Sequence, residues 1–165
     1  MSRSDPTRLH FVLDQNFPWY AASVEWPSSL KISRLNDVDS TLTHDKEDWE
    51  VLLGLSSRGD VDGFITNDAK MLMLPSEMVA LSRTRLAVVI PDDVGYAPIR
   101  ATGLVMVHIE EISKSLDGRP QVFRLRARQV KREFPRDHLE RIATQRKQRV
   151  SDVIHWETQK MGLRP

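Results

Sequence analysis

Short apolar runs that end on a carboxylate recur along this chain. The first run, residues 9–13, is mostly apolar and leaves no solvent face, and residues 64–66 and 88–90 repeat the pattern. A strand that is covered on both faces, as in a parallel sheet, has this pattern. The carboxylates that follow these runs are Asp14, Asp68, Asp92 and Asp93.

Segments with helical periodicity lie between these runs. Asn16 as a cap and Pro18 in the first turn are typical of a helix start after the first run. The alternation of strands and helices predicts the α/β class, with three α/β/α layers and a mostly parallel central sheet. We expect strands at residues 9–13, 30–35, 61–66 and 86–90, helices at 17–25, 45–57, 77–82 and 98–116, and a loop at 36–46.

Two of these helices carry apolar stripes with a spacing of three and four residues, which predicts their buried faces. His108 lies on the second stripe, where a lone histidine is more often a hydrogen-bonded core residue than a ligand. The stripes are Trp49, Leu52, Leu53 and Ser56, and Ala101, Leu104, Val105, His108, Ile109 and Ile112.

The last third of the chain has a different pattern. Residues 122–130 alternate, which predicts one half-buried edge strand, and residues 135–160 predict one long helix. Arginines on the exposed face of this strand can follow a phosphate backbone, or they can protect the edge from aggregation. These arginines are Arg124, Arg126 and Arg128. We therefore expect a domain over residues 1–118 and a basic extension over residues 119–165 that packs on it or projects from it.

Charge is distributed unevenly, although the net charge of the 165 residues is only +1. Residues 1–118 carry a net charge of −7 and residues 119–149 a net charge of +8. Such asymmetry suggests a polyanion partner, and a solvated basic helix face is the simpler interpretation. The final helix is expected to contact RNA, a second copy of the chain, or a protein partner.

Composition excludes several classes of function. The chain has no cysteine, so disulfides, thiolate metal sites and cysteine catalysis are excluded. No apolar run is long enough to span a membrane, and the N-terminus is polar without a hydrophobic signal region. The default expectation is a cytoplasmic protein with no membrane partner.

A parallel sheet would gather the carboxylates named above along one edge. Asp48 begins a predicted helix and joins them if that helix end projects over the edge. A cluster of charged carboxylates needs a counter-charge, and all-oxygen ligation favours Mg²⁺ or Mn²⁺. Such ions activate water and stabilise phosphoryl transition states, which predicts a nuclease-like site. Each acid also has a simpler interpretation, as a helix cap or a turn residue.

Three short motifs in the first half of the chain resemble the PIN-like family, particularly its compact branch. They occur in the family's order with the expected spacing, between residue 10 and about residue 90. The family pattern runs L-D-E-N-x-P, then an acid that opens a helix, D-x-x-[IVL]-L, then [IV]-T-x-D. The matching segments are Leu13-Asp14-Gln15-Asn16-Phe17-Pro18, Asp48-Trp49-Glu50-Val51-Leu52 and Ile65-Thr66-Asn67-Asp68.

The resemblance implies a metal-dependent ribonuclease that hydrolyses RNA phosphodiesters, and many such proteins are toxins with an antitoxin protein as partner. It implies that Asn16 orients a ligand or water and that Thr66 bonds the Asp14 region or the substrate. Asp92 is a weaker candidate for a fourth acid. The metal ligands implied are Asp14, Asp48 and Asp68.

The chain departs from the family pattern at three positions. Gln15 stands where the family often has Glu, Asn67 where it often has Arg, and Lys70 where it often has a second acid. Lys70 can leave the site with one metal or none, or it can meet a scissile phosphate. A catalytically decayed module that binds RNA or a protein partner is therefore the main alternative. A receiver-like domain phosphorylated at Asp68 is disfavoured, because the paired acids after the first strand are absent.

Overall fold

A six-stranded sheet organises the chain, as seen in a computed structural model that describes residues 8–95 and 97–165. Residues 1–7, which belong to the polar N-terminus considered above, lie outside the described residues. The strands are β1 (Leu9–Leu13), β2 (Leu30–Arg34), β3 (Gly63–Ile65), β4 (Ala87–Pro91), β5 (Gln121–Arg126) and β6 (Gln129–Glu133). The α-helices are α1 (Leu35–Val38), α2 (Asp48–Arg58), α3 (Pro75–Ser82), α4 (Pro98–Ser115), α5 (Pro135–Gln145) and α6 (Val150–Lys160). Short 3₁₀ helices are η1 (Trp19–Ser23), η2 (Ser40–Leu42) and η3 (Ala69–Met73).

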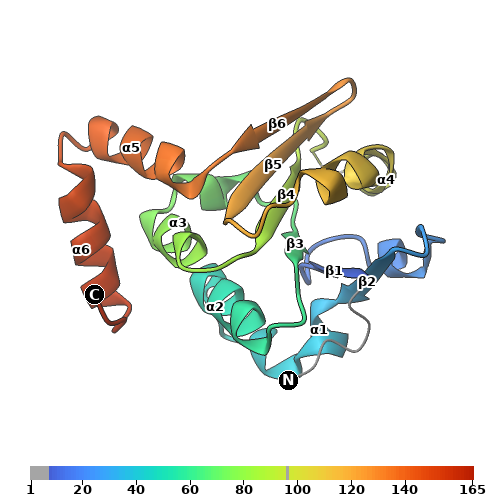
Figure 1. The fold of residues 1–165 in the computed structure, drawn as a ribbon, viewed down its shortest axis with the longest axis horizontal. Coiled ribbons are helices and arrows are strands. Elements are labelled where there is room, and N and C mark those ends of the chain that lie inside the picture. The colour runs from blue at the N-terminus through green and yellow to red at the C-terminus, as the bar shows by residue number, and fades with distance from the viewer. Residues whose placement is uncertain (1–7, 96) are drawn as a thin grey trace.

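The order of strands in the sheet is β2-β1-β3-β4-β5-β6, and every pair is parallel except β5 with β6. Two hydrophobic clusters lie on opposite faces of this sheet. Val12, Phe64 and Val88 pack with α2, α3 and the C-terminal helices, whereas Phe11 and Val89 pack with α4. Figure 1 shows α4 on the other side of the sheet from α2 and α3. The α/β class with a mostly parallel sheet and helices on both faces is confirmed.

The centre of the sheet depends on one glycine. Gly63 lies in β3 opposite Phe11 of β1. A Cβ atom at Gly63 would lie 2.5 Å from the Phe11 ring and 2.9 Å from the Ala87 carbonyl oxygen. Both distances are shorter than van der Waals contact, so any side chain here would separate β1, β3 and β4.

The prediction of a single edge strand over residues 122–130 is wrong. The segment forms the hairpin of β5 and β6, and the edge strand is β6. Arg124 and Arg126 belong to β5, whereas Arg128 lies exposed in the turn. The alternation of polar and apolar residues continues through the turn, so it contained no signal for the reversal.

The prediction of one helix over residues 135–160 is also wrong, because the chain breaks between α5 and α6. Lys147 adopts a positive φ of 53°. The Gln148 N–H donates to the Ala143 carbonyl at 2.9 Å, and the Lys147 N–H donates to the Thr144 carbonyl at 3.1 Å. These two hydrogen bonds form a Schellman motif, which usually has glycine where this chain has Lys147.

The structure also differs from the sequence predictions in one predicted loop, one helix cap and one buried helix face. Residues 36–46 are not a continuous loop, since α1 and η2 lie within residues 35–42. Asn16 is not the cap of η1, whose N-cap is Pro18. The buried face of α2 differs from the predicted stripe in all but Leu52. It consists of Val51, Leu52 and Leu55.

The predicted stripe of α4 is confirmed, with Leu104 only partly buried. His108 is buried, and its Nε2 lies 2.8 Å from the Arg126 carbonyl oxygen, so it is a satisfied core histidine. Within the described ranges, none of the helices is both long and apolar enough to cross a membrane.

Candidate active site at the carboxyl edge of the sheet

The order of strands reverses between β1 and β3. From β1 the chain moves outward to β2, then returns to β3 on the opposite side of β1. In open α/β sheets, ligands bind outside the carboxyl ends of the strands at such a switch point. Asp14 directly follows β1 and Thr66 directly follows β3, so both lie at this position.

Hydrogen bonds join the two strand ends. The Thr66 hydroxyl is buried and donates to Asp14 Oδ2 at 2.9 Å. The same hydroxyl oxygen accepts the Asp68 N–H at 3.0 Å. Thr66 therefore fixes the Asp14 carboxylate and sets the direction in which the chain leaves β3 toward Asp68.

Asp48 approaches the same edge from α2. It is the first residue of this helix, at whose N-terminus the Glu50 carboxylate accepts the Glu47 N–H at 3.0 Å. Burial raises the pKa of Asp48 to about 6, and the charges of Asp14, Glu77 and Asp68 contribute to the increase. The charges of Asp14 and Asp68, which follow β1 and β3, thus act on Asp48 at the start of α2.

Burial also raises the pKa of Asp14, and the Asp68 charge adds to the effect. Hydrogen bonds from Thr66 and from the N–H groups of Asn16 and Gln15 act in the opposite direction. The charge of Asp68 therefore opposes the ionisation of both Asp14 and Asp48, and the charge of Asp14 opposes that of Asp48.

Glu77 is an acid near this site that the sequence analysis missed. It lies in the first turn of α3, is only 3% exposed, and accepts a hydrogen bond from the Ser76 hydroxyl at 2.6 Å. Burial raises its pKa, and its charge helps to raise that of Asp48. In the sequence, a glutamate two residues after a proline is the ordinary start of a helix, so only its neighbours in space reveal this position.

Asp68 and Lys70 border an open cleft of about 570 Å³ beside Asn16, Asn67 and the start of α4. Asp68 Oδ1 accepts the Lys70 N–H at 2.9 Å and so caps η3. One oxygen of Asp68 therefore has the role of a helix cap, which is the simpler interpretation given for this residue above. The side chains of Asn16, Asp68 and Lys70 are exposed to this cleft, where a ligand can reach them.

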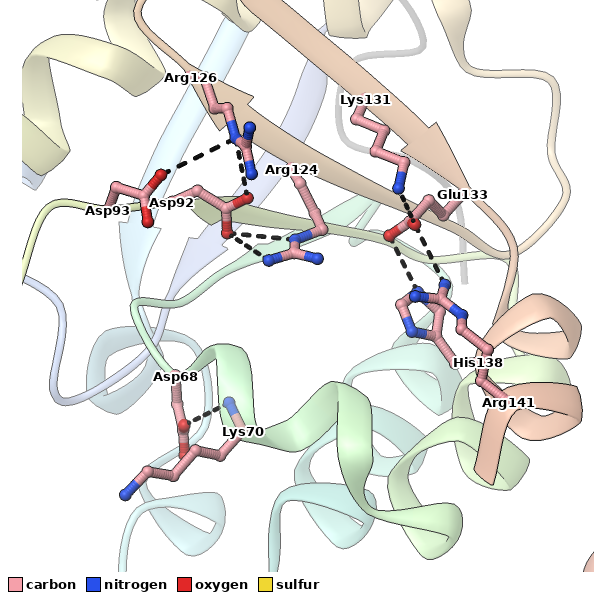
Figure 2. A network of polar contacts seen from close by, with 10 residues as sticks. All are labelled: Asp68, Lys70, Asp92, Asp93, Arg124, Arg126, Lys131, Glu133, His138 and Arg141. Carbon is pink, nitrogen blue, oxygen red and sulfur yellow. Dashed lines mark hydrogen bonds and ion pairs between the residues drawn. The ribbon is translucent and has the colours of Figure 1, made fainter. Parts of the chain in front are cut away.

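The remaining predicted site residues lie to the side of this cleft. Asp92 is buried at the end of β4, where its Oδ1 accepts hydrogen bonds from Arg124 Nε at 3.1 Å and Nη2 at 3.0 Å. Arg126 Nε lies 3.8 Å from Asp92 Oδ2 and 3.9 Å from Asp93 Oδ2 (Figure 2). Asp92 is therefore better placed to hold Arg124 than to ligate a cation.

The donor set at the strand ends has the chemistry of a hard-cation site. Burial and nearby charges raise the pKa values of Asp14 and Asp48, and a bound divalent cation would stabilise their ionised forms. Oxygen ligands suit Mg²⁺ or Mn²⁺. Across residues 8–95 and 97–165, however, no three histidine, aspartate or glutamate side chains converge as ligands of one ion would. The oxygen donors of these acids suit such an ion, but the side chains of Asp14, Asp48 and Asp68 do not converge around one point.

No protein-family model matches the chain, and comparisons with curated proteins and with solved structures give no significant match.

Proposed function

We propose that this protein is a Mg²⁺- or Mn²⁺-dependent ribonuclease of the PIN-like type. The observation that carries the proposal is the electrostatic coupling of Asp14, Asp48 and Asp68 at the switch point of the sheet. These acids come from three separate parts of the chain. Such an arrangement raises the free energy of the folded chain at neutral pH when no cation is bound. Carboxyl groups with pKa values perturbed in this way are concentrated at active sites.

The residues of the site have distinct roles in this proposal. Thr66 holds the Asp14 carboxylate in one orientation and positions Asp68 through its backbone. Asp48 adds the third carboxylate from the start of α2. When bound, Mg²⁺ or Mn²⁺ supplies stabilisation of a phosphoryl transition state and lowers the pKa of water.

Lys70 gives the cleft a cation beside the acids. Its side chain lies exposed in the same cleft as Asp68 and Asn16. An ammonium group can bind a phosphate oxygen as a point charge, which favours a role for Lys70 on the RNA backbone. Arg124 and Arg126 extend the positive charge toward β5 (Figure 2).

Calorimetric titration with Mn²⁺ tests the site directly. We expect the unmodified chain to bind Mn²⁺ and to cleave single-stranded RNA, and Asp14→Asn to lose both properties while it stays folded. Asp93→Asn is the matched control, because its carboxylate is exposed beside Arg126 and away from the acids. Its φ of 57° is one that Asn also adopts readily. Cleavage that persists in an Asp14→Asn, Asp68→Asn double variant would exclude the site.

A module that binds RNA or a protein without cleaving it is the second candidate. It is favoured by Lys70, which places a positive charge where an acid would complete the site, and by the lack of three converging ligands among the described residues. In that case neither the unmodified chain nor Asp14→Asn binds Mn²⁺, and RNA still binds to both with equal affinity.

A further inference from the structure

A second pocket lies between η3, β5 and α5, and the proposed reaction does not use it. Its volume is about 290 Å³, and we refer to it as the α5 pocket. Leu72 and Ile142, both buried, give it an apolar floor, and the exposed Met73 also lines it. The charged residues that line it are Lys70, Arg124 and Arg141, with no carboxylate among the lining residues. The ammonium group of Lys70 points away from the two guanidinium groups (Figure 2).

Carboxylates outside the α5 pocket hold the two guanidinium groups in place. Asp92 accepts hydrogen bonds from Arg124, as described above, and Glu133 Oε1 accepts one from Arg141 Nη2 at 3.1 Å. Figure 2 shows Arg124 between Asp92 on one side and the Glu133–His138 pair on the other. A guanidinium has five N–H donors, so each arginine keeps donors for a ligand after these contacts. Both cations are therefore oriented before any ligand binds.

His138 supplies a buried polar group to the same pocket. Its side chain is 3% exposed, and its Nε2 lies 3.2 Å from Glu133 Oε2 without hydrogen-bond geometry. Burial lowers the pKa of His138 to about 4, and the charge of Arg141 contributes. The imidazole is therefore neutral at pH 7, and an anion in the pocket would favour its protonation.

Lys70 lines both the α5 pocket and the cleft that contains Asp68. The two cavities are thus neighbours along η3, which starts directly after Asp68. A chain-like ligand that lies in the cleft can continue past Lys70 into the α5 pocket. The volume of about 290 Å³ lies at the lower limit of small-ligand pockets, which favours a single small group such as one nucleotide as the occupant.

We propose that the α5 pocket binds one unpaired nucleotide of single-stranded RNA, with its phosphate on Arg124 and Arg141. Its base lies on the apolar floor of Leu72 and Ile142. The pocket is a subsite for a nucleotide next to the one at the acids, so this inference rests on the proposed function for its substrate class. The bound phosphate is either a terminal group or an internal phosphodiester.

Binding of a ten-residue oligouridylate, followed by fluorescence anisotropy on the Asp14→Asn chain, tests this subsite. We expect Arg141→Gln to weaken binding about tenfold, as the loss of one charge-assisted hydrogen bond predicts. Arg136→Gln is the matched control on the same helix, because Arg136 is exposed and pairs with Glu140. It should change affinity less than twofold. A duplex of the same length should bind without dependence on Arg141.

The His138 ring gives a second measurement that does not depend on cleavage. Uridine 5′-monophosphate should raise the pKa of His138, as followed by NMR of its ring protons, and uridine should not. Oligonucleotides with and without a 5′-phosphate then distinguish a terminal phosphate from an internal one. Equal affinities of Arg141→Gln and Arg136→Gln, together with an unmoved His138 pKa, would overturn the proposal. Arg141-dependent binding of polyglutamate in preference to oligouridylate would also overturn it, in favour of an acidic protein partner.

These outcomes separate the subsite from the proposed function. If the Asp14→Asn, Asp68→Asn double variant still cleaves RNA but Arg141→Gln weakens binding, the α5 pocket stands and the acidic site is excluded. If Asp14→Asn abolishes cleavage and Arg141→Gln binds like the unmodified chain, only the subsite is excluded.

Discussion

Asp48 is a carboxyl group whose ionisation the fold opposes. Its folded-state pKa of about 6 lies above the ordinary value of 3.8, so the folded chain binds more protons than the unfolded chain between these values. The free energy of unfolding therefore falls as pH rises from about 4 to about 6. We expect Asp48→Asn to remove this loss and to be more stable at pH 7.5 by on the order of 1 kcal/mol, after allowance for solvent screening.

Urea unfolding at pH 3.5 and at pH 7.5 measures the effect. The variant and the unmodified chain should agree at the lower pH and diverge at the higher one. Asp45→Asn removes the same charge three residues earlier, at an exposed position with a φ of 53° that Asn also tolerates. If Asp45→Asn gives the same difference as Asp48→Asn, the coupling at the strand ends is not the cause.

Thr66 is the residue on which the geometry of the acids depends most directly. Thr66→Val would keep the shape but remove the donor to Asp14 Oδ2 and the acceptor of the Asp68 N–H. We expect a loss of about 1–3 kcal/mol in the free energy of unfolding, because a buried partner is left unsatisfied. Chemical denaturation measures this loss. Thr66→Ser keeps the hydroxyl and should lose much less, and equal losses in the two variants would contradict the role given to these bonds.

The break between α5 and α6 shows how one residue ends an element. Lys147 occupies the left-handed position of the Schellman motif, which costs a non-glycine residue about 1–2 kcal/mol. We expect Lys147→Gly to raise the free energy of unfolding by about 0.5–1 kcal/mol. Arg146→Gly, one residue earlier in right-handed helical backbone, should lower it by a similar amount. Thermal unfolding of both variants measures these changes. If both variants are less stable than the unmodified chain, Lys147 does not occupy the left-handed position of a Schellman motif.

The elements that could be predicted from the sequence are those with an unambiguous period. The buried stripe of α4 is such an element, and β1 was predictable for a different reason, because its mostly apolar run is bounded by a turn. The hairpin of β5 and β6 could not be predicted, because alternation continues through a turn that lacks glycine. The end of α5 was missed for the related reason that Lys147 stands where a glycine would have marked it.

The candidate site was predictable to the extent that it depends on strand ends. Asp14 and Thr66 are placed by β1 and β3, and a parallel sheet brings such positions to one edge. Glu77 was not predictable, since its distance from Asp48 depends on how α3 packs against α2. The pairing of Asp92 with Arg124 depends on the register of β4 with β5, which the pattern of either strand alone does not define.

At the scale of the whole molecule, the basic C-terminal third shares one sheet and one core with the acidic part. β5 pairs with β4 along Ala87–Pro91, and Leu139 and Val153 belong to the same hydrophobic cluster as Val12. A chain that ends at residue 118 would lose these contacts and expose the edge of β4. Exposed parallel edges with apolar side chains on both faces promote aggregation.

We therefore expect the fragment 1–118 to lack a cooperative thermal transition, whereas a chain that ends at Met161 should retain one. The second chain keeps every strand and helix, so it controls for truncation itself. Near-ultraviolet circular dichroism during heating distinguishes the two, because a chain without fixed packing loses its aromatic signal. A sharp transition in the fragment 1–118 would mean that the acidic part folds alone. The positive charge of residues 119–149 would then belong to a separable appendage, and the α5 pocket could move relative to the acids.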